Sequence, residues 1–189
     1  MALTLYHLPF DHRPWSVFAD SDRLRALNPL MRVPALVLRD GVVLTDSHMI
    51  LDHLDTLVAE PMFPRDEPAR HRALQVAALA TGLAEKAVSL FYERRLHAVT
   101  SPVWETRLQT QITSVLAALE GDRAARDSLW WFGDRFGHAD IAVACALRFV
   151  AEAHPAMIGT AHPRLARHAA AMEALPVFRQ ISQAFAAPA

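Results

Sequence analysis

Residues 28–55 read NPLMRVPALVLRDGVVLTDSHMILDHLD, and this stretch decides the fold of the N-terminal part of the chain. Its two β-rich runs, ALVL and VVLT, are joined by the turn formers Asp40 and Gly41, which predicts an antiparallel hairpin. A helix is predicted to begin at Asp46 or Ser47, because either side chain can accept a hydrogen bond from the first backbone N–H groups of a helix. The apolar residues after this cap recur at helical spacing, so the helix is expected to pack one stripe against the hairpin.

Two further elements are predicted upstream of the hairpin. The run ADSDRLRALNP, residues 19–29, is typical of a short helix that ends at Asn28 and Pro29. The SVF segment, residues 16–18, favours one more strand. The N-terminal part is therefore expected to combine short helices with a small sheet.

The composition changes at AEPMFPRDEP, residues 59–68, where three prolines in ten positions disfavour both helix and sheet. We therefore predict a first domain of residues 1–58, a linker over residues 59–67 and an all-helical domain over residues 68–189. The predicted fold class is α/β followed by all-α.

Helical patterning continues through the C-terminal domain. Two long helices are predicted over residues 68–98 and 102–120, as an antiparallel pair, and two shorter ones near 163–173 and 176–185. Between these pairs, FGHADIAVACALRFVAEA is apolar on nearly all sides, which is typical of a central helix surrounded by protein.

The start of this central helix has a capping pattern. With Gly137 as the cap, Asp140 stands at the third helical position, where its carboxylate can accept a hydrogen bond from the backbone N–H of the cap. We therefore interpret Asp140 as structural and not catalytic. Cys145 lies midway along the same helix and is predicted to be a buried, unreactive core thiol. Trp130 and Trp131, just before the helix, are predicted to pack.

The bulk composition excludes several classes of function. Lys and Arg total 19 against 20 for Asp and Glu, so the chain has almost no net field to attract nucleic acid or an anionic membrane. Charged residues break its apolar stretches before the ~20 residues needed to cross a bilayer. The single cysteine cannot form an internal disulfide, and we expect a cytoplasmic protein. The histidines lack the spacing of paired ligands, so no metal is expected.

Residues 28–55 closely resemble the segment of the glutathione S-transferase family that holds a cis-proline, a hairpin and the glutathione-binding helix. FGHADIAVACALRF, residues 136–149, is similar to the family's buried C-terminal helix with its capping box, although Gly137 stands where Ser or Thr is usual. The two motifs at this separation are much more specific than either alone. The resemblance implies an incomplete thioredoxin-like N-terminal domain followed by the family's C-terminal helical bundle.

The resemblance also implies a glutathione site. Val33 and Pro34 match the family's cis-proline bend, where the amide and carbonyl of Val33 would pair with the cysteinyl residue of glutathione. Asp46 and Ser47, at the start of the next helix, would hold the γ-glutamyl carboxylate. Arg32 is either a ligand for the glycyl carboxylate or a solvated surface charge.

The chain departs from the family at its N-terminus. In the family, a first strand and a loop with the catalytic Ser, Cys or Tyr precede the first helix, and the end of that helix runs into a stretch that LPFDHRPWSVF resembles here. Only MALTLYH precedes this stretch in the chain. We therefore interpret residues 2–8 as the end of the first helix of a truncated member in which the catalytic residue is unknown. In an alternative alignment, residues 2–9 form the first strand and Tyr6 binds the thiolate. Ser16 is a further candidate for the residue that activates the thiol.

By resemblance, the expected function is conjugation of the glutathione thiolate to small hydrophobic electrophiles by the complete form of the protein. Glutathione is then the co-substrate, and a homodimer is the expected assembly. The alternative is a non-catalytic glutathione-transferase-like module for binding or dimerisation, and a third possibility is a helical protein that binds an apolar ligand between helices. Phe91, Tyr92 and Arg95 lie where the family places its second substrate.

Overall fold

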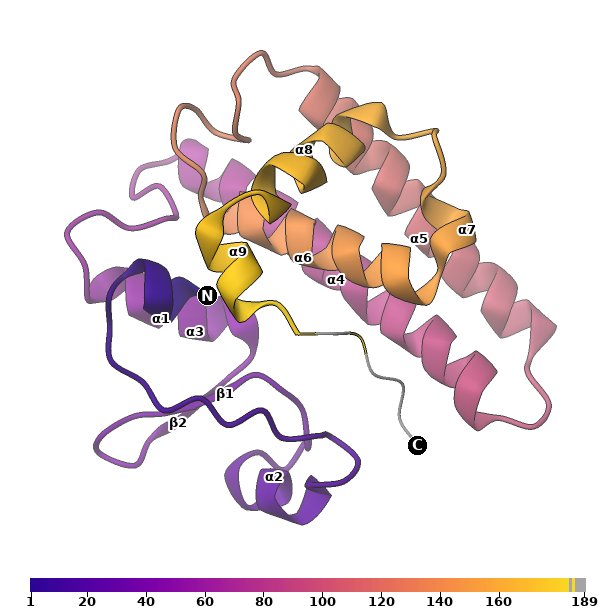
Figure 1. Cartoon of the computed structure of the whole chain (residues 1–189), viewed down its shortest axis with the longest axis horizontal. Helices are drawn as coiled ribbons and strands as arrows, with labels where there is room; N and C mark the ends of the chain where they lie inside the picture. Colours follow the sequence, from indigo (N-terminus) through magenta and orange to yellow (C-terminus); the bar gives the residue numbers. More distant parts are fainter. Residues whose placement is uncertain (184, 186–189) are drawn as a thin grey trace. The chain divides into compact units, whose positions relative to one another are not determined.

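Figure 1 shows the computed structural model of the chain, which describes residues 1–183 and 185. The chain divides into two compact units, residues 1–61 and residues 62–185. Within the described residues, the first unit holds three helices and a two-stranded sheet, and the second holds six helices. We call them the hairpin unit and the helical unit.

The hairpin unit contains, in chain order, α1 (Ala2–Leu5), α2 (Ser21–Leu27), β1 (Ala35–Val37), β2 (Val43–Thr45) and α3 (Ser47–Thr56). The predicted hairpin is confirmed, because β1 and β2 pair antiparallel with Ala35 opposite Thr45 and Val37 opposite Val43. The predicted short helix is confirmed as α2, and the predicted helix after the hairpin as α3. α3 packs against both strands.

The turn of the hairpin is formed by the two residues that the sequence indicates. Gly41 has a φ of +88°, a backbone conformation in which a side chain is strained. Asp40 Oδ1 accepts a hydrogen bond from the Val42 N–H at 3.0 Å, and the Leu38 N–H donates to the Val42 carbonyl at 2.8 Å. These bonds close the loop and fix the register of the strands.

The N-terminal 20 residues differ from two sequence-based expectations. The prediction of a strand at residues 16–18 is wrong, because the Ser16 side chain accepts hydrogen bonds from the Phe18 and Ala19 N–H groups at 3.3 and 3.2 Å. Such local bonds to the backbone favour a turn over an extended strand. The alternative in which residues 2–9 form a strand is also wrong, since Ala2–Leu5 is helical.

The helical unit contains α4 (Ala69–Leu96), α5 (Pro102–Ala124), α6 (His138–Ala153), α7 (Pro155–Ile158), α8 (Pro163–Glu173) and α9 (Pro176–Ile181). The two long helices, the central helix and the two shorter C-terminal helices are thereby confirmed. The four-residue α7 is not predicted by the sequence pattern. α4 and α5 lie side by side, and α6 packs on α4 and α8 (Figure 1).

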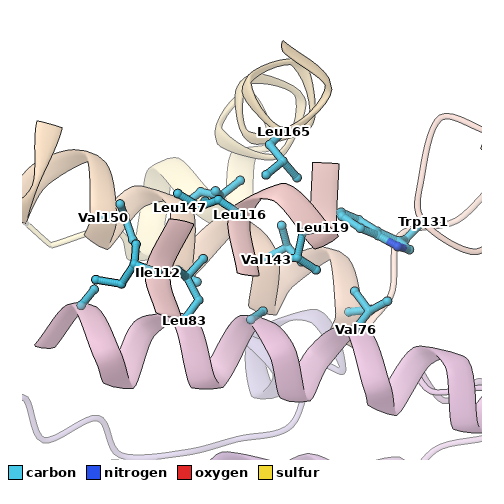
Figure 2. Packing of buried hydrophobic residues seen from close by; sticks show 14 of the residues in the cluster. Val76, Leu83, Ile112, Leu116, Leu119, Trp131, Val143, Leu147, Val150 and Leu165 are labelled. Carbon is cyan, nitrogen blue, oxygen red and sulfur yellow. The ribbon is translucent and has the colours of Figure 1, made fainter. Parts of the chain in front are cut away.

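One hydrophobic core holds the helical unit together. Leu83 of α4, Ile112 of α5, Val143 of α6 and Leu165 of α8 converge in it, each at most 1% exposed (Figure 2). Trp131 is fully buried in the same core, which confirms that this aromatic residue packs. Burial of one such side chain contributes roughly 1.5–3 kcal/mol, so the core dominates the stability of this unit.

α4 is long and apolar enough, by length and composition, to cross a bilayer. In the structure its buried side chains, among them Ala80, Leu83, Ala87 and Leu90, belong to the core that α5 and α6 share. The core helix of a folded protein passes the same composition test.

The start of α6 is fixed by the carboxylate of Asp140. Its Oδ2 accepts the Gly137 N–H at 2.9 Å, which confirms the predicted capping contact, and its Oδ1 accepts the Trp131 N–H at 2.8 Å. Asp140 is 1% exposed, and burial raises the pKa of its carboxyl group. These contacts give Asp140 a structural role.

Cys145 differs from the prediction of a buried side chain, because it is exposed. Desolvation nevertheless raises the pKa of its thiol, which agrees with the predicted lack of reactivity. The neighbouring buried side chains of α6 are Val143, Ala144, Ala146 and Leu147. Since α6 is apolar on nearly all sides, the hydrophobic pattern does not distinguish its covered face from its open one.

The buried histidines of the helical unit predict how its stability depends on pH. His154 is 5% exposed, and its Nε2 lies 2.8 Å from the carbonyl oxygen of Ala87. Burial lowers the pKa of His154 below the ordinary value of 6.5, and it also lowers the pKa of His168. Such a group adds stability above its unfolded pKa and loses that stability as the pH falls through the folded pKa. We therefore expect urea denaturation to give a lower free energy of unfolding near pH 5.5 than near pH 7.5.

The variant His154→Gln provides the control. It keeps an N–H donor for the Ala87 carbonyl but does not titrate, so its stability should fall less over the same range. The raised pKa of Asp140 acts in the opposite sense in both proteins, so the comparison isolates the contribution of His154. Wild-type stability that is equal or greater at the lower pH would contradict this account.

Candidate functional site

The hairpin places both halves of the predicted glutathione site at one end of the sheet. The Val33–Pro34 peptide bond is cis, as predicted, and Pro34 directly precedes Ala35, the first residue of β1. Ala35 pairs with Thr45, the last residue of β2, and Asp46 follows Thr45. Directly paired residues lie about 5 Å apart. The bend and the start of α3 therefore lie at the same end of the hairpin.

Asp46 begins α3 in an unusual backbone conformation. Its φ is +73° and its ψ is 133°, a combination that residues with a side chain rarely adopt. Its Oδ1 accepts the His48 N–H at 2.8 Å, which confirms the predicted helix cap. Residues held in such sparsely populated regions cluster at functional sites. Asp46 is also exposed, so its carboxylate is accessible to a cationic group from solvent.

Ser47 is the first residue of α3 and is half-buried. Its hydroxyl lies at the N-terminus of a ten-residue helix, where backbone N–H groups and the helix dipole favour an anion. The start of α3 thus combines an exposed carboxylate with an end that attracts negative charge. A zwitterionic group, with an ammonium and a carboxylate on one carbon, satisfies both.

Asn28 organises the loop that leads to the bend, a role that sequence reasoning missed. Its side chain is buried, with Oδ1 accepting the Leu30 N–H and Nδ2 donating to the Arg32 carbonyl, both at 3.0 Å. Its own carbonyl accepts the Met31 N–H at 2.8 Å. The Asn-Pro pair after a helix indicates a turn, but it does not indicate which carbonyl the amide binds.

Arg32 and Val33 are exposed where this loop ends. Val33 is 52% exposed, so an extended peptide can approach it from solvent. A guanidinium at Arg32 is able to bind a carboxylate through two parallel hydrogen bonds. Both interpretations of Arg32, ligand or surface charge, stay predictions.

The hydroxyls of Tyr6 and Ser16, the two other candidates for activating the thiol, both take part in structural contacts. The Tyr6 hydroxyl donates a hydrogen bond to Oδ1 of Asp55 on α3, and Asp55 is 6% exposed. This bond ties the N-terminal helix to α3. Ser16, as described above, stabilises a turn through its Oγ. Activation of a thiol by Tyr6 remains a prediction, and the contact favours a structural role.

The variant Tyr6→Phe separates these two roles. We expect it to lower the free energy of unfolding by about 1–2 kcal/mol, because it removes a hydrogen bond to a largely buried carboxylate. Urea denaturation of Tyr6→Phe, Asp55→Asn and the double variant should show that the two substitutions are not additive. Additive losses, or a raised thiol pKa of bound glutathione in Tyr6→Phe with unchanged stability, would contradict the structural role.

The residues predicted to meet a second substrate lie at the end of α4. The Phe91 ring packs edge-on against His154 and Phe185, at centroid distances of 6.5 and 5.3 Å. Desolvation by burial raises the pKa of the Tyr92 hydroxyl, which therefore stays neutral at physiological pH. Arg95 is exposed. Their contact with a substrate stays a prediction.

The sequence and the structure of the chain are both similar to those of known proteins. The family model described as glutathione S-transferase, N-terminal domain, matches residues 1–62, and that of the C-terminal domain matches residues 102–171. A maleylacetoacetate isomerase of Pseudomonas aeruginosa is 29% identical over 191 residues, which cover 95% of this chain and 87% of the relative.

Solved structures agree with these matches. A glutathione transferase family member from Pseudomonas fluorescens, with bound glutathione, is 31% identical with a TM-score of 0.77, over 95% of this chain and 89% of that chain. A glutathione S-transferase from Methylobacterium radiotolerans, in complex with glutathione sulfonate, is 30% identical with a TM-score of 0.82, over 100% and 91%. The predicted fold class, a thioredoxin-like part with a small sheet followed by a helical bundle, is confirmed. The chain therefore belongs to the glutathione S-transferase family.

Proposed function

We propose that this chain binds glutathione at the end of its hairpin and functions as a glutathione transferase-like protein. The observation that carries the proposal is the strand register, since pairing of Ala35 with Thr45 brings Val33-Pro34 and Asp46-Ser47 together. The glutathione bound in the Pseudomonas fluorescens relative supports the identity of the ligand.

Each part of glutathione has a matching group in this arrangement. The main-chain polar groups of Val33 pair with the cysteinyl residue in the manner of an added strand. The γ-glutamyl end carries an ammonium and a carboxylate, which suit the Asp46 carboxylate and the Ser47 end of α3 respectively. The glycyl carboxylate is the partner for Arg32. Asn28 holds the backbone of this loop in place through the Arg32 carbonyl.

The chemistry that we propose is attack of the glutathione thiolate on a small hydrophobic electrophile. A cysteine thiol has an ordinary pKa of about 8.5, so a donor must stabilise the thiolate for it to dominate near neutral pH. We assign no residue of this chain to that role. The name of the Pseudomonas aeruginosa relative makes maleylacetoacetate a second compound to assay, because its electron-poor double bond is a thiolate acceptor.

The alternative is a non-catalytic glutathione-transferase-like module. The hydrogen bonds of Tyr6 and Ser16 favour this alternative. Each of these two candidate thiol-activating hydroxyls is bonded to another group of the protein. A homodimer is compatible with both functions, and light scattering of the purified chain tests it directly.

Binding and turnover are tested separately. The purified chain is passed over immobilised glutathione and then assayed for conjugation to an aryl halide and for isomerisation of maleylacetoacetate. Retention with turnover supports the transferase, and retention without turnover supports the binding module. Failure of the folded chain to bind glutathione would remove glutathione from the proposal.

The variant Ser47→Ala tests the proposed γ-glutamyl contact. We expect a loss of about tenfold or more in glutathione affinity by calorimetry, because a hydrogen bond to a charged ligand group is removed. Stability should change little, since the cap of α3 is Asp46. The matched control is Ser21→Ala, which alters the residue after Asp20, the N-cap of α2, and should leave affinity unchanged. Equal affinities of wild type and Ser47→Ala would contradict the contact.

A further inference from the structure

A cavity of about 400 Å³, open to solvent on one side, lies on the helical unit between α6, α7 and α8. Its walls are mostly apolar and include Leu147 of α6, Ile158 of α7 and Leu165 of α8. This volume falls at the lower end of the range of small-molecule sites, which are concave and largely apolar with a few placed polar groups. All of its lining residues belong to the helical unit, whereas the proposed glutathione ligands belong to the hairpin unit.

The cavity exists because small residues face one another across it. α6 contributes Ala144 and Ala151, and α8 contributes Ala166, Ala169 and Ala170. Side chains of one carbon fill the space between two helices only where the axes approach to about 8 Å, so a wider separation between alanines leaves a cavity. Ile158 and Gly159, at the end of α7, line it as well.

The polar groups of the cavity carry an excess of negative charge. Arg148 Nε lies 3.2 Å from Oε1 of Glu152, and Arg148 Nη1 lies 3.2 Å from Oε2 of Glu173. One guanidinium thus serves two carboxylates, and it also donates to the hydroxyl of Ser182. The charged side chains are each about one-third exposed, at 32%, 34% and 37%, so a ligand in the pocket can reach them from solvent.

We propose that this cavity is a binding site for a small apolar molecule with one cationic group, such as a primary alkylammonium. The apolar body fills the space between the alanines of α6 and α8, and the ammonium meets Glu152 and Glu173 at the opening. An anionic ligand is disfavoured, because the guanidinium that would receive it is already paired with both carboxylates. A neutral ligand of the same shape leaves the excess charge uncompensated.

His162 is the other titratable side chain of the lining, and its Nδ1 lies 3.3 Å from the Ile158 carbonyl. Experiments near pH 8 keep an alkylammonium charged. The charged side chains of the lining are Arg148, Glu152 and Glu173.

The test uses three probes with one apolar body: 4-phenylbutylammonium, 4-phenylbutanol and 4-phenylbutyrate. Titration of the full chain is followed through the methyl resonance of Ile158, assigned with the variant Ile158→Val, and by calorimetry. We expect the ammonium to bind up to about fivefold more tightly than the alcohol, and the carboxylate more weakly than the alcohol. Equal affinity for ammonium and alcohol, preference for the carboxylate, or no shift of Ile158 would each overturn the proposal.

Charge variants sharpen this test. In Glu152→Gln/Glu173→Gln, the excess charge at the opening changes sign, so the preference should reverse toward 4-phenylbutyrate. If the preference for the ammonium is unchanged in this variant, the carboxylates are not its partners and the proposal fails. Circular dichroism establishes that the variant is folded.

A volume variant tests the location independently of charge. Ala170→Leu fills the cavity from α8 and should abolish binding of all three probes, whereas Ala118→Leu, on the exposed side of α5, should leave it intact. Binding that survives Ala170→Leu would place the probe elsewhere. Because these measurements need no glutathione, their outcome is independent of the proposed function.

Discussion

Replacement of Asp140 by alanine is expected to lower the free energy of unfolding of the helical unit by about 3–5 kcal/mol, the largest effect that we predict. The carboxylate accepts the Trp131 N–H at 2.8 Å and the Gly137 N–H at 2.9 Å while only 1% exposed. Alanine removes the acceptor for both donors, and an unsatisfied buried donor costs roughly 1–3 kcal/mol. The contact with Trp131 also holds the connection between α5 and α6 in place.

Two variants control this prediction. Asp140→Asn keeps the size and one acceptor oxygen but turns an amide N–H₂ toward the second donor, so it should lie between wild type and alanine. Asp127→Ala removes an exposed carboxylate before α6 and should change stability by less than about 0.5 kcal/mol. Urea denaturation followed by tryptophan fluorescence measures all three. A loss below about 1 kcal/mol in Asp140→Ala would show that water or another group replaces the carboxylate.

The parts of the fold that the sequence predicts correctly depend on neighbours along the chain. The hairpin follows from two β-rich runs around Asp40-Gly41, and the cap of α3 from Asp46 two residues before the N–H that it accepts. The long helices of the second unit follow from apolar residues at helical spacing. In each case the residues that decide the structure lie within one or two turns of one another.

The parts that the sequence does not predict depend on side chains from distant positions. The Tyr6 hydroxyl bonds Asp55, 49 residues away, and nothing around Tyr6 indicates that partner. Glu120 of α5 accepts the N–H groups of Arg164 and Leu165, both at 2.9 Å, and so caps α8 from another helix. No local pattern at the start of α8 contains that carboxylate.

The candidate site shows the same division. Val33-Pro34 and Asp46-Ser47 are identified through local motifs, and the register that joins them follows from the hairpin. The sequence does not identify Asn28 as a positioning residue, because nothing in it indicates that the Asn28 amide donates a hydrogen bond to the Arg32 carbonyl. The sequence does not predict the cavity between α6 and α8, because its lining alanines come from two helices that are neighbours only in the folded chain.

The second large effect is expected from Gly137→Ser, and its sign is opposite to what the capping motif alone suggests. Serine is a favoured N-cap residue, so a sequence argument predicts a more stable α6. In the structure, however, a Cβ at position 137 would lie 2.5 Å from the carbonyl oxygen of Met62. That oxygen belongs to the backbone and cannot rotate away, so the segment before α4 must shift. We expect a loss of about 1–3 kcal/mol in the free energy of unfolding, as for other overpacked positions.

The matched control is Gly121→Ala in α5, where an added Cβ meets nothing within 4 Å. Alanine there should raise the free energy of unfolding by roughly 0.5–1 kcal/mol, because glycine disfavours a helix interior. Opposite signs for the two substitutions, measured by urea denaturation under the same conditions, identify the close approach of Met62 as the reason for glycine at the cap. If Gly137→Ser is as stable as wild type or more so, the hydroxyl cap outweighs the displaced backbone, and Gly137 is not required by packing.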